Sequence, residues 1–323
     1  MRYVEVGGVR VSAIGLGTWQ FGAREWGYGD DYARHEARSI VERALDLGVN
    51  LVDTAEMYAM GRSERIVGDA IRGRREEVFL ATKLLPIAPF PPIVQWRARE
   101  SARRLGVDRI DLYQIHWPNP IVPDGPAMEG MRRVMDAGLV AHAGVSNYSL
   151  RRWRTAEASL GRPVLSNQVK FNLAERKPLH ELLPWAQQEG RIVIAYSPLA
   201  QGFLSGRYDP EHLPSGSARR TNPLFLPENL ARGAELIEVL RSVANAHDAT
   251  PAQVALAWLI RRPNVVAIPG ASSVAQLEAN VAAADLDLSD DDDHRLSEAA
   301  ERYDPQRGTQ AIPGLARRVL ARS

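Results

Sequence analysis

The sequence predicts an α/β fold, a (β/α)8 TIM barrel with an N-terminal β-hairpin and extra helices toward the C-terminus, formed by residues 1–323 as one domain. Eight short apolar runs alternate with amphipathic segments, and this order is typical of parallel βαβ units. A chain of 323 residues with 45% apolar side chains can fill one such barrel and its outer core. An open doubly wound sheet built from the same units is the alternative.

The N-terminal residues alternate around a glycine pair. Tyr3 to Val11, with Gly7-Gly8 at the centre, predicts a hairpin. The apolar run 13–18 follows at once and is the first expected barrel strand, so we expect the hairpin to lie outside the main sheet. The spacing of apolar residues predicts a helix over 34–47 that ends at Gly48, a residue suited to the left-handed cap.

The remaining elements follow the same alternation of short apolar runs and helical periodicity. Strands are expected at 50–53, 78–83, 110–116, 140–145, 163–169, 192–196 and 265–268, and helices at 63–71, 92–105, 128–137, 149–159, 178–189, 229–247, 251–261, 273–283 and 289–302. In the last helix Ser289 is the expected N-cap, and the acidic run 290–293 suits the positive end of the helix dipole better than a metal site. Segment 200–228 is rich in Gly, Pro and Ser, which indicates a functional or mobile loop.

Composition excludes several classes of protein. The formal net charge of +1 gives no field to attract nucleic acid or acidic membranes. With no cysteine there is neither a disulfide framework nor a thiolate metal site, which fits a reducing compartment. We find no apolar signal segment and no run of membrane-spanning length, so a cytoplasmic location is expected. The oligomeric state is left open.

Four polar residues fall at or after the ends of adjacent expected strands. Asp53 closes the second strand and Tyr58 lies five residues on, while Lys83 and His116 end the third and fourth strands. In a parallel barrel the carboxyl ends of the strands share one rim, so these side chains can meet. Each alone has an ordinary explanation: a turn residue, an amphipathic cover, a lysine reaching solvent, a packed histidine.

Together the four residues describe a proton donor. A nearby ammonium at Lys83 would favour the phenolate of Tyr58 and lower its pKa, and Asp53 would balance the buried ammonium. His116 could bond the oxygen of a bound carbonyl and fix its angle. A carbonyl polarised in this way lacks only a hydride, which a nicotinamide cofactor supplies.

The usual dinucleotide fingerprint is absent, because Gly15 to Gly22 has Gln20 in the pattern and no helix begins there. Polar groups instead end the later strands at 144–147, 167–168, 196–199 and 268–273, the last opening a helix whose N-terminus can hold a phosphate. A metal-dependent isomerase or hydrolase ranks last. Such an enzyme needs carboxylates and histidines spaced to bind a metal ion, and the sequence lacks this set. The six other histidines lie away from His116, namely His35, His142, His180, His212, His247 and His294.

Over nearly its whole length the sequence resembles the aldo-keto reductase superfamily. The similar stretches are Gly15-Leu16-Gly17-Thr18-Trp19, Gly48 to Ala55 with Tyr58 and Ser63-Glu64, Asp111 to Trp117, Gly144-Val145-Ser146-Asn147 and Ile268-Pro269-Gly270-Ala271. The resemblance implies a barrel that binds NADP(H) without a Rossmann domain and reduces aldehydes or ketones. It implies Tyr58 as general acid, supported by Lys83 and Asp53, with His116 orienting the carbonyl.

The resemblance also implies the residues that hold the cofactor. Tyr196 would stack on the nicotinamide, and its carboxamide would be bound by Ser146, Asn147 and Gln168. The diphosphate and ribose arms would be held by Ser197, Leu199, Gly202, Gly270 and Ser272, and the adenosine end by Gln276 and Asn280. Many members carry an arginine where this chain has Gln276, so NADH stays open beside NADPH, and Arg219 or Arg220 could compensate.

The expected substrate is a small-molecule carbonyl. The mouth would be lined by Trp19, Trp26, Met57, Tyr58, Trp117 and Phe90, which suits aldehydes and ketones with apolar bodies. Trp26 and Phe90 are equally compatible with ordinary surface cover. In the superfamily that the sequence resembles, some relatives are redox-sensing accessory subunits with little turnover, and this second function stays open.

Overall fold

The computed structural model describes residues 1–22, 35–214 and 217–320, and a parallel eight-stranded sheet forms its centre. The first and last strands meet, because Gly15 N donates to Ala267 O at 2.8 Å and Ala267 N donates to Ala13 O at 2.9 Å. The sheet therefore closes into the predicted barrel, and the open-sheet alternative is wrong. The strands in order around it are β3 (Leu16–Gly17), β4 (Leu51–Asp53), β5 (Phe79–Leu84), β6 (Ile110–Ile115), β7 (Val140–Ser146), β8 (Val164–Lys170), β9 (Ile192–Tyr196) and β10 (Val265–Ala267).

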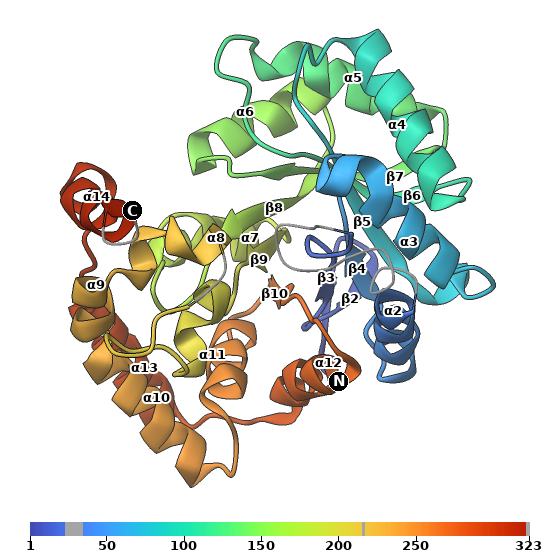
Figure 1. The fold of residues 1–323 in the computed structure, drawn as a ribbon. Helices are drawn as coiled ribbons and strands as arrows, with labels where there is room; N and C mark the ends of the chain where they lie inside the picture. Colours follow the sequence, from blue (N-terminus) through green and yellow to red (C-terminus); the bar gives the residue numbers. More distant parts are fainter. Residues whose placement is uncertain (23–34, 215–216, 321–323) are drawn as a thin grey trace.

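Helices surround the barrel on its outer face (Figure 1). Those that follow the strands are α2 (Glu36–Asp46), α3 (Arg62–Ala70), α4 (Pro91–Leu105), α5 (Asp124–Asp136), α6 (Leu150–Leu160), α7 (Leu182–Gln188), α11 (Pro251–Ile260) and α12 (Val274–Ala282). Additional helices are α8 (Ser217–Arg220), α9 (Pro227–Arg232), α10 (Ala234–Ala246), α13 (Asp290–Arg302) and α14 (Ile312–Leu320).

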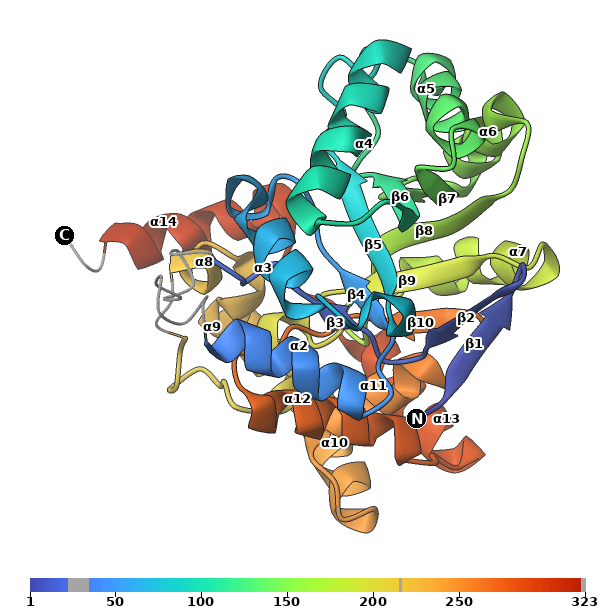
Figure 2. The same cartoon turned by 90° about the vertical axis from the view of Figure 1, so that its right-hand side faces the viewer.

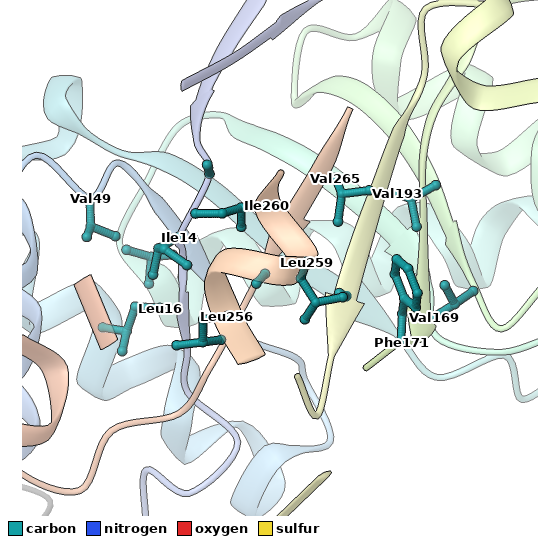
Figure 3. Packing of buried hydrophobic residues seen from close by; sticks show 14 of the residues in the cluster. Ile14, Leu16, Val49, Val169, Phe171, Val193, Leu256, Leu259, Ile260 and Val265 are labelled. Carbon is teal, nitrogen blue, oxygen red and sulfur yellow. The ribbon is translucent and has the colours of Figure 1, made fainter. Parts of the chain in front are cut away.

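Most of the apolar core lies between the barrel and these helices. Figure 3 shows Leu256, Leu259 and Ile260 of α11 against the strands, near Ile14 on one side and Val193 on the other. All seven residues from Val254 to the end of α11 are buried, which explains why this part of the helix lacks a polar face. Burial of such side chains is the main favourable term for the fold.

A second, smaller apolar cluster fills the inside of the barrel. It joins Leu51, Ala81, Leu112 and Ile194 to Val9 and Val11 of the hairpin, which is formed by β1 (Tyr3–Val6) and β2 (Val9–Ser12). The hairpin forms its own two-stranded sheet, as expected. Figure 2 shows it on the side of the molecule opposite α8 and α14. The hairpin thus covers the N-terminal end of the barrel, and the carboxyl ends of the strands form the other end.

Several helices differ from the expected boundaries. Gly233 divides the expected helix 229–247 into α9 and α10, and a 3₁₀ turn at Lys177–Leu179 takes up the start of the expected helix 178–189. Helix α5 begins at Asp124 rather than at 128. The expected strand 13–18 is regular only at Leu16–Gly17. Segment 200–228, expected as a loop, contains two 3₁₀ turns and the short α8 in its described part.

Two expected helix ends are confirmed. Gly48 has φ 80° directly after α2, in the left-handed region that favours glycine. Ser289 Oγ accepts from Asp292 N at 3.1 Å, and the Asp292 carboxylate accepts from Ser289 N at 3.1 Å, which is a capping box. In the part of the chain that the structure describes, no helix has both the length and the apolar character needed to cross a membrane.

Candidate active site

The four side chains expected to cooperate lie together at the carboxyl end of the barrel. Asp53 is the last residue of β4, Lys83 is the penultimate residue of β5, and His116 directly follows β6. Tyr58 opens a 3₁₀ turn, Tyr58–Gly61, in the loop after β4. The parallel register of β4, β5 and β6 brings these strand ends to one edge.

The Lys83 ammonium connects the other groups. Its Nζ donates to Asp53 Oδ1 at 2.5 Å, to Thr54 O at 2.8 Å and to Tyr58 OH at 3.3 Å. Lys83 and Asp53 are both almost fully buried, so the pair is screened from water. Burial acts against the charge on Lys83, but Asp53 and Tyr58 outweigh it, and the pKa of Lys83 is raised. The ammonium is therefore charged at neutral pH.

The net pKa shift of Tyr58 differs from the sequence expectation. Burial raises the pKa of Tyr58 above its ordinary value, and the Asp53 carboxylate adds to this; the Lys83 ammonium opposes both but does not overcome them. The expectation that lysine sets the direction was wrong, because the desolvation of a half-buried ring dominates. The phenol consequently holds its proton at neutral pH, the form that a general acid needs.

His116 is neutral over the whole working range of pH. Burial, with a contribution from the Lys83 charge, lowers the pKa of His116 to about 2. Its ring packs edge-on to Tyr58 with ring centroids 5.7 Å apart, and it lies against Trp117 at 4.4 Å. The buried Nδ1 of His116 has no hydrogen-bond partner among the residues that the structure describes. A neutral imidazole fixed in this way can donate to, or accept from, a bound molecule.

A polar layer inside the barrel extends the site beyond the residues found from the sequence. Asp53 Oδ2 accepts from Gln168 Nε2 at 2.8 Å and from Gln114 Nε2 at 3.4 Å, and Ser166 Oγ donates to Gln114 Oε1 at 3.3 Å. Gln114 and Ser166 were missed. The alternation of inward residues along β6, where Gln114 stands two positions before His116, is a signal that could have identified Gln114.

Ala59 follows the tyrosine, and its backbone is strained. Ala59 and Met60 have φ 47° and 57°, and Gly61 continues the run with φ 77°. An L-residue in this left-handed conformation costs about 1–2 kcal/mol. The strain lies directly after Tyr58, as strain often does at functional loops.

We expect Ala59→Gly to raise the free energy of unfolding by about 0.5–1 kcal/mol, because the relief of strain exceeds the entropic cost of glycine. Urea denaturation measures it. Ala158→Gly, at an exposed position inside α6, is the matched control and should destabilise by about 0.5–1 kcal/mol. A loss of stability in both variants would contradict the strain at Ala59.

The residues expected to hold a nicotinamide lie at or near the carboxyl ends of β7, β8 and β9. Ser146 Oγ donates to Gln168 O at 2.8 Å, and Asn147 Nδ2 donates to Ser146 Oγ at 3.0 Å. Tyr196 OH donates to Asn147 Oδ1 at 2.9 Å, which fixes the half-buried ring at the rim. Asn147 and Ser197 have φ 61° and 48°, so both loops carry backbone strain of the kind found at ligand sites.

The residues expected for the diphosphate and adenosine arms lie further along the same rim. Leu199 precedes the 3₁₀ turn Ala200–Ser205, in which Gly202 has φ 98°. Beside β10, Gln276 Oε1 accepts from both N and Oγ of Ser272 at 2.8 Å, and Asn280 Nδ2 donates to Gly270 O at 3.3 Å. These contacts order the start of α12, where helix amides favour a phosphate.

Gly270 has little room for a side chain. A Cβ there would lie 2.7 Å from Gln20 Oε1, and Gln20 Nε2 donates to Ala271 O at 2.8 Å. Gln20 belongs to the loop after β3, so it holds the end of β10 across the seam of the barrel. The donor set, the glycine, the exposed tyrosine face and the strained loops together fit an extended dinucleotide.

The apolar residues expected at the mouth are exposed. Trp19, Met57 and Trp117 are 45%, 41% and 36% exposed, and Phe90 is 48% exposed. Trp26 lies outside the described residues. Across residues 1–22, 35–214 and 217–320 no group of three or more His, Asp or Glu side chains could hold a metal ion.

Comparisons with known proteins agree with this geometry. The model of the aldo/keto reductase family matches residues 13–301. An uncharacterised oxidoreductase of Mycobacterium tuberculosis is 57% identical over 323 residues, all of both chains. The methylglyoxal reductase YeaE of Escherichia coli is 34% identical, covering 88% of this chain and 89% of that one. The structure of a Klebsiella pneumoniae aldo/keto reductase with NADP and acetate has a TM-score of 0.75 at 34% identity, covering 95% and 98%.

Proposed function

Because this chain belongs to the aldo/keto reductase family, we propose that it is an NADP(H)-dependent oxidoreductase that reduces aldehyde and ketone carbonyls to alcohols. The observation that carries the proposal is the Lys83 ammonium, which contacts both the Asp53 carboxylate and the Tyr58 hydroxyl at the rim of the barrel. Such a cluster has a protonated phenol, a charge that stabilises its phenolate, and a counter-charge for that ammonium.

Each residue has a defined part in the proposed reaction. Tyr58 OH donates its proton to the carbonyl oxygen, and Lys83 stabilises the phenolate that remains. Neutral His116 hydrogen-bonds the same carbonyl oxygen and fixes its angle toward Tyr58. Asp53, held by Gln168 and Gln114, keeps Lys83 in place. A bound nicotinamide supplies the hydride that reaches the carbonyl carbon.

NADP(H) is the proposed cofactor, since the Klebsiella pneumoniae reductase was solved with NADP. Gln276 offers no charge to a 2′-phosphate. Arg219 lies close to the expected diphosphate segment, because its Nε donates to Gln201 O at 3.0 Å, next to Gly202. The guanidinium of Arg219 is therefore the cation that we propose for a phosphate arm of the cofactor.

A carbonyl with an apolar body is the proposed substrate class, because Trp19, Met57 and Trp117 present exposed apolar surface beside the polar cluster. The E. coli relative is named as a methylglyoxal reductase, which makes methylglyoxal the small member of a first carbonyl panel.

The purified protein should bind NADPH more tightly than NADH and oxidise NADPH with reactive aromatic aldehydes. Quenching of its tryptophan fluorescence measures binding, and loss of nicotinamide absorbance measures turnover. Tight binding of NADPH with negligible turnover across the panel would instead favour the accessory-subunit function. Failure to bind either nucleotide would refute the proposal.

A further inference from the structure

Glu56 is a buried acidic residue two positions before Tyr58 that the proposed mechanism does not use. Its side chain is 10% exposed, and it accepts hydrogen bonds from two directions. One donor is the backbone N–H of Leu85, and the other is Arg97 NH1 of α4 at 2.5 Å. Arg104 NH2 lies 3.9 Å from the second carboxylate oxygen. An isolated loop carboxylate would stay in water, so this burial needs a reason.

The contacts of Glu56 extend the pairing of β4 with β5 into the loop that carries Tyr58. Beyond the end of β4, Thr54 N donates to Ala81 O at 2.9 Å and Glu56 N donates to Lys83 O at 3.2 Å. The Glu56 carboxylate then accepts from Leu85 N. Main chain and side chain of Glu56 thus hold the carboxyl end of β5, at the Lys83 carbonyl and at the Leu85 N–H just beyond the strand.

The charges around Glu56 make the contact between the Tyr58 loop and β5 costly to break. Arg97 is mostly buried, and within the described part of the chain its Nε has no hydrogen-bond partner, so the charge of Arg97 relies on Glu56 for compensation. Burial raises the pKa of Glu56, whereas the Leu85 N–H and the Arg97 charge act to lower it. Removing the carboxylate would leave a buried cation and an unbonded backbone N–H, both costly.

We propose that Glu56 is a positioning residue for catalysis, which sets the distance between the Tyr58 hydroxyl and the Lys83 ammonium by holding the Tyr58 loop to β5. The inference rests on the proposed function. Proton donation depends steeply on this geometry, since a misplacement of about 1 Å can cost about 10²-fold in rate. In the alternative, Glu56 is an ion-pair partner that stabilises the fold and nothing more.

The chain offers a matched control at the opposite end of the barrel. Glu157 Oε2 accepts from Val164 N at 2.9 Å and from Arg191 Nε at 2.8 Å, the same combination of one backbone N–H and one arginine. Val164 is the first residue of β8, so this attachment is remote from Tyr58. Glu157 variants therefore report the general effect of losing such a carboxylate.

The test compares Glu56→Gln, Glu56→Met and Glu157→Met, each with and without Tyr58→Phe. We expect Glu56→Met to lower kcat about 10- to 100-fold, with the Kd for NADPH and the KM for the aldehyde within about twofold of wild type. Glu56→Gln retains an acceptor for Leu85 N, so its kcat should lie between those of wild type and Glu56→Met. In the Tyr58→Phe background neither Glu56 variant should lower the residual rate further, because the two residues act as one unit.

A second readout does not depend on turnover. The phenol of Tyr58 is titrated by near-ultraviolet absorbance, as the difference between each protein and its Tyr58→Phe partner. We expect Glu56→Met to raise the pKa of Tyr58, because a displaced phenol loses the Lys83 charge, and Glu157→Met to leave it unchanged. This measurement stands even if wild-type protein reduces no carbonyl, which would refute the proposed function alone.

Three results would overturn the inference. The first is that Glu56→Met lowers kcat by the same factor in the Tyr58→Phe background as in wild type. The second is that Glu157→Met lowers kcat as much as Glu56→Met does. The third is that the pKa of Tyr58 is unchanged in a Glu56→Met protein that circular dichroism shows to be fully folded.

Discussion

Tyr58→Phe is expected to lower kcat for aldehyde reduction by about 10²- to 10⁴-fold, the usual contribution of a positioned general acid. The variant keeps the ring and its edge-on packing against His116, and loses only the hydroxyl that lies 3.3 Å from Lys83 Nζ. The Kd for NADPH should stay within about twofold, because the change removes transition-state rather than cofactor contacts. Steady-state rates and a fluorescence titration measure the two quantities.

Tyr3→Phe is the control for the loss of a tyrosine hydroxyl. Tyr3 OH donates to Gly48 O at 2.9 Å in the hairpin region, at the closed end of the barrel. This variant should retain wild-type kcat. If Tyr58→Phe retained the wild-type kcat, another group would donate the proton to the carbonyl oxygen, and the role of Tyr58 would be refuted.

The pH dependence of kcat follows from the same phenol. The acid form is active, so rate is lost as pH rises through the Tyr58 pKa, which burial raises above about 10. With a pKa of about 2, His116 does not titrate near neutrality. We therefore expect kcat to be constant from about pH 6 to pH 9 and to fall only as pH rises further. A kcat that falls as pH is lowered through about 6.5 would mean that His116 titrates there.

Lys83→Met is expected to destabilise the protein by about 3–5 kcal/mol, as the removal of one partner from a buried ion pair does. Among the described residues, the buried Asp53 carboxylate would then keep the amides of Gln168 and Gln114 as its partners and no cation. Chemical denaturation at neutral pH gives the free energy of unfolding. Activity should also fall, since the phenolate of Tyr58 would lose its stabilising charge.

The double variant Lys83→Met/Asp53→Asn separates charge from packing. Without a carboxylate there is no uncompensated buried charge, so the double variant should be more stable than Lys83→Met alone. Additive losses would show that the ion pair is not the source of the effect. A Lys83→Met protein as stable as wild type would mean that water reaches Asp53.

Much of the barrel could be predicted because its signals are local. Each strand is a short apolar run, and the helices that begin at a good cap, such as the one after Ser289, were placed to within a residue. Boundaries failed where tertiary packing decides. One expected helix divides at Gly233, where a Cβ would lie 2.5 Å from Phe203, a close approach that no periodicity reveals.

The tail after Tyr303 shows the same limit. The sequence after Tyr303 predicts no element with a defined packing partner, yet residues 312–320 form α14. Gly314 lies against Leu226, and Arg318 NH1 donates to Phe225 O at 3.0 Å. Those partners belong to segment 200–228, for which the sequence offered no regular structure to pack against.

The sequence predicted which residues stand at the strand ends of the site, but not all of the hydrogen bonds and ion pairs that connect them. Asp53, Lys83 and His116 meet because β4, β5 and β6 are parallel neighbours, which the order of elements already implied. Glu56 was missed because an acidic loop residue is usually solvated, and only the fold brings Arg97 and Leu85 N to it. The direction of the Tyr58 pKa was also wrong, since sequence does not report burial.

The hairpin that covers the N-terminal end of the barrel has a consequence for the order of events. Val9 and Val11 pack into the apolar interior below the polar layer, so among the described residues the path from Tyr58 to bulk water lies at the rim. In the proposed reaction, each reduction would leave a Tyr58 phenolate that is reprotonated from solvent. The alcohol of the proposed reaction would leave through that same opening, so we expect Tyr58 to regain its proton after the product has left.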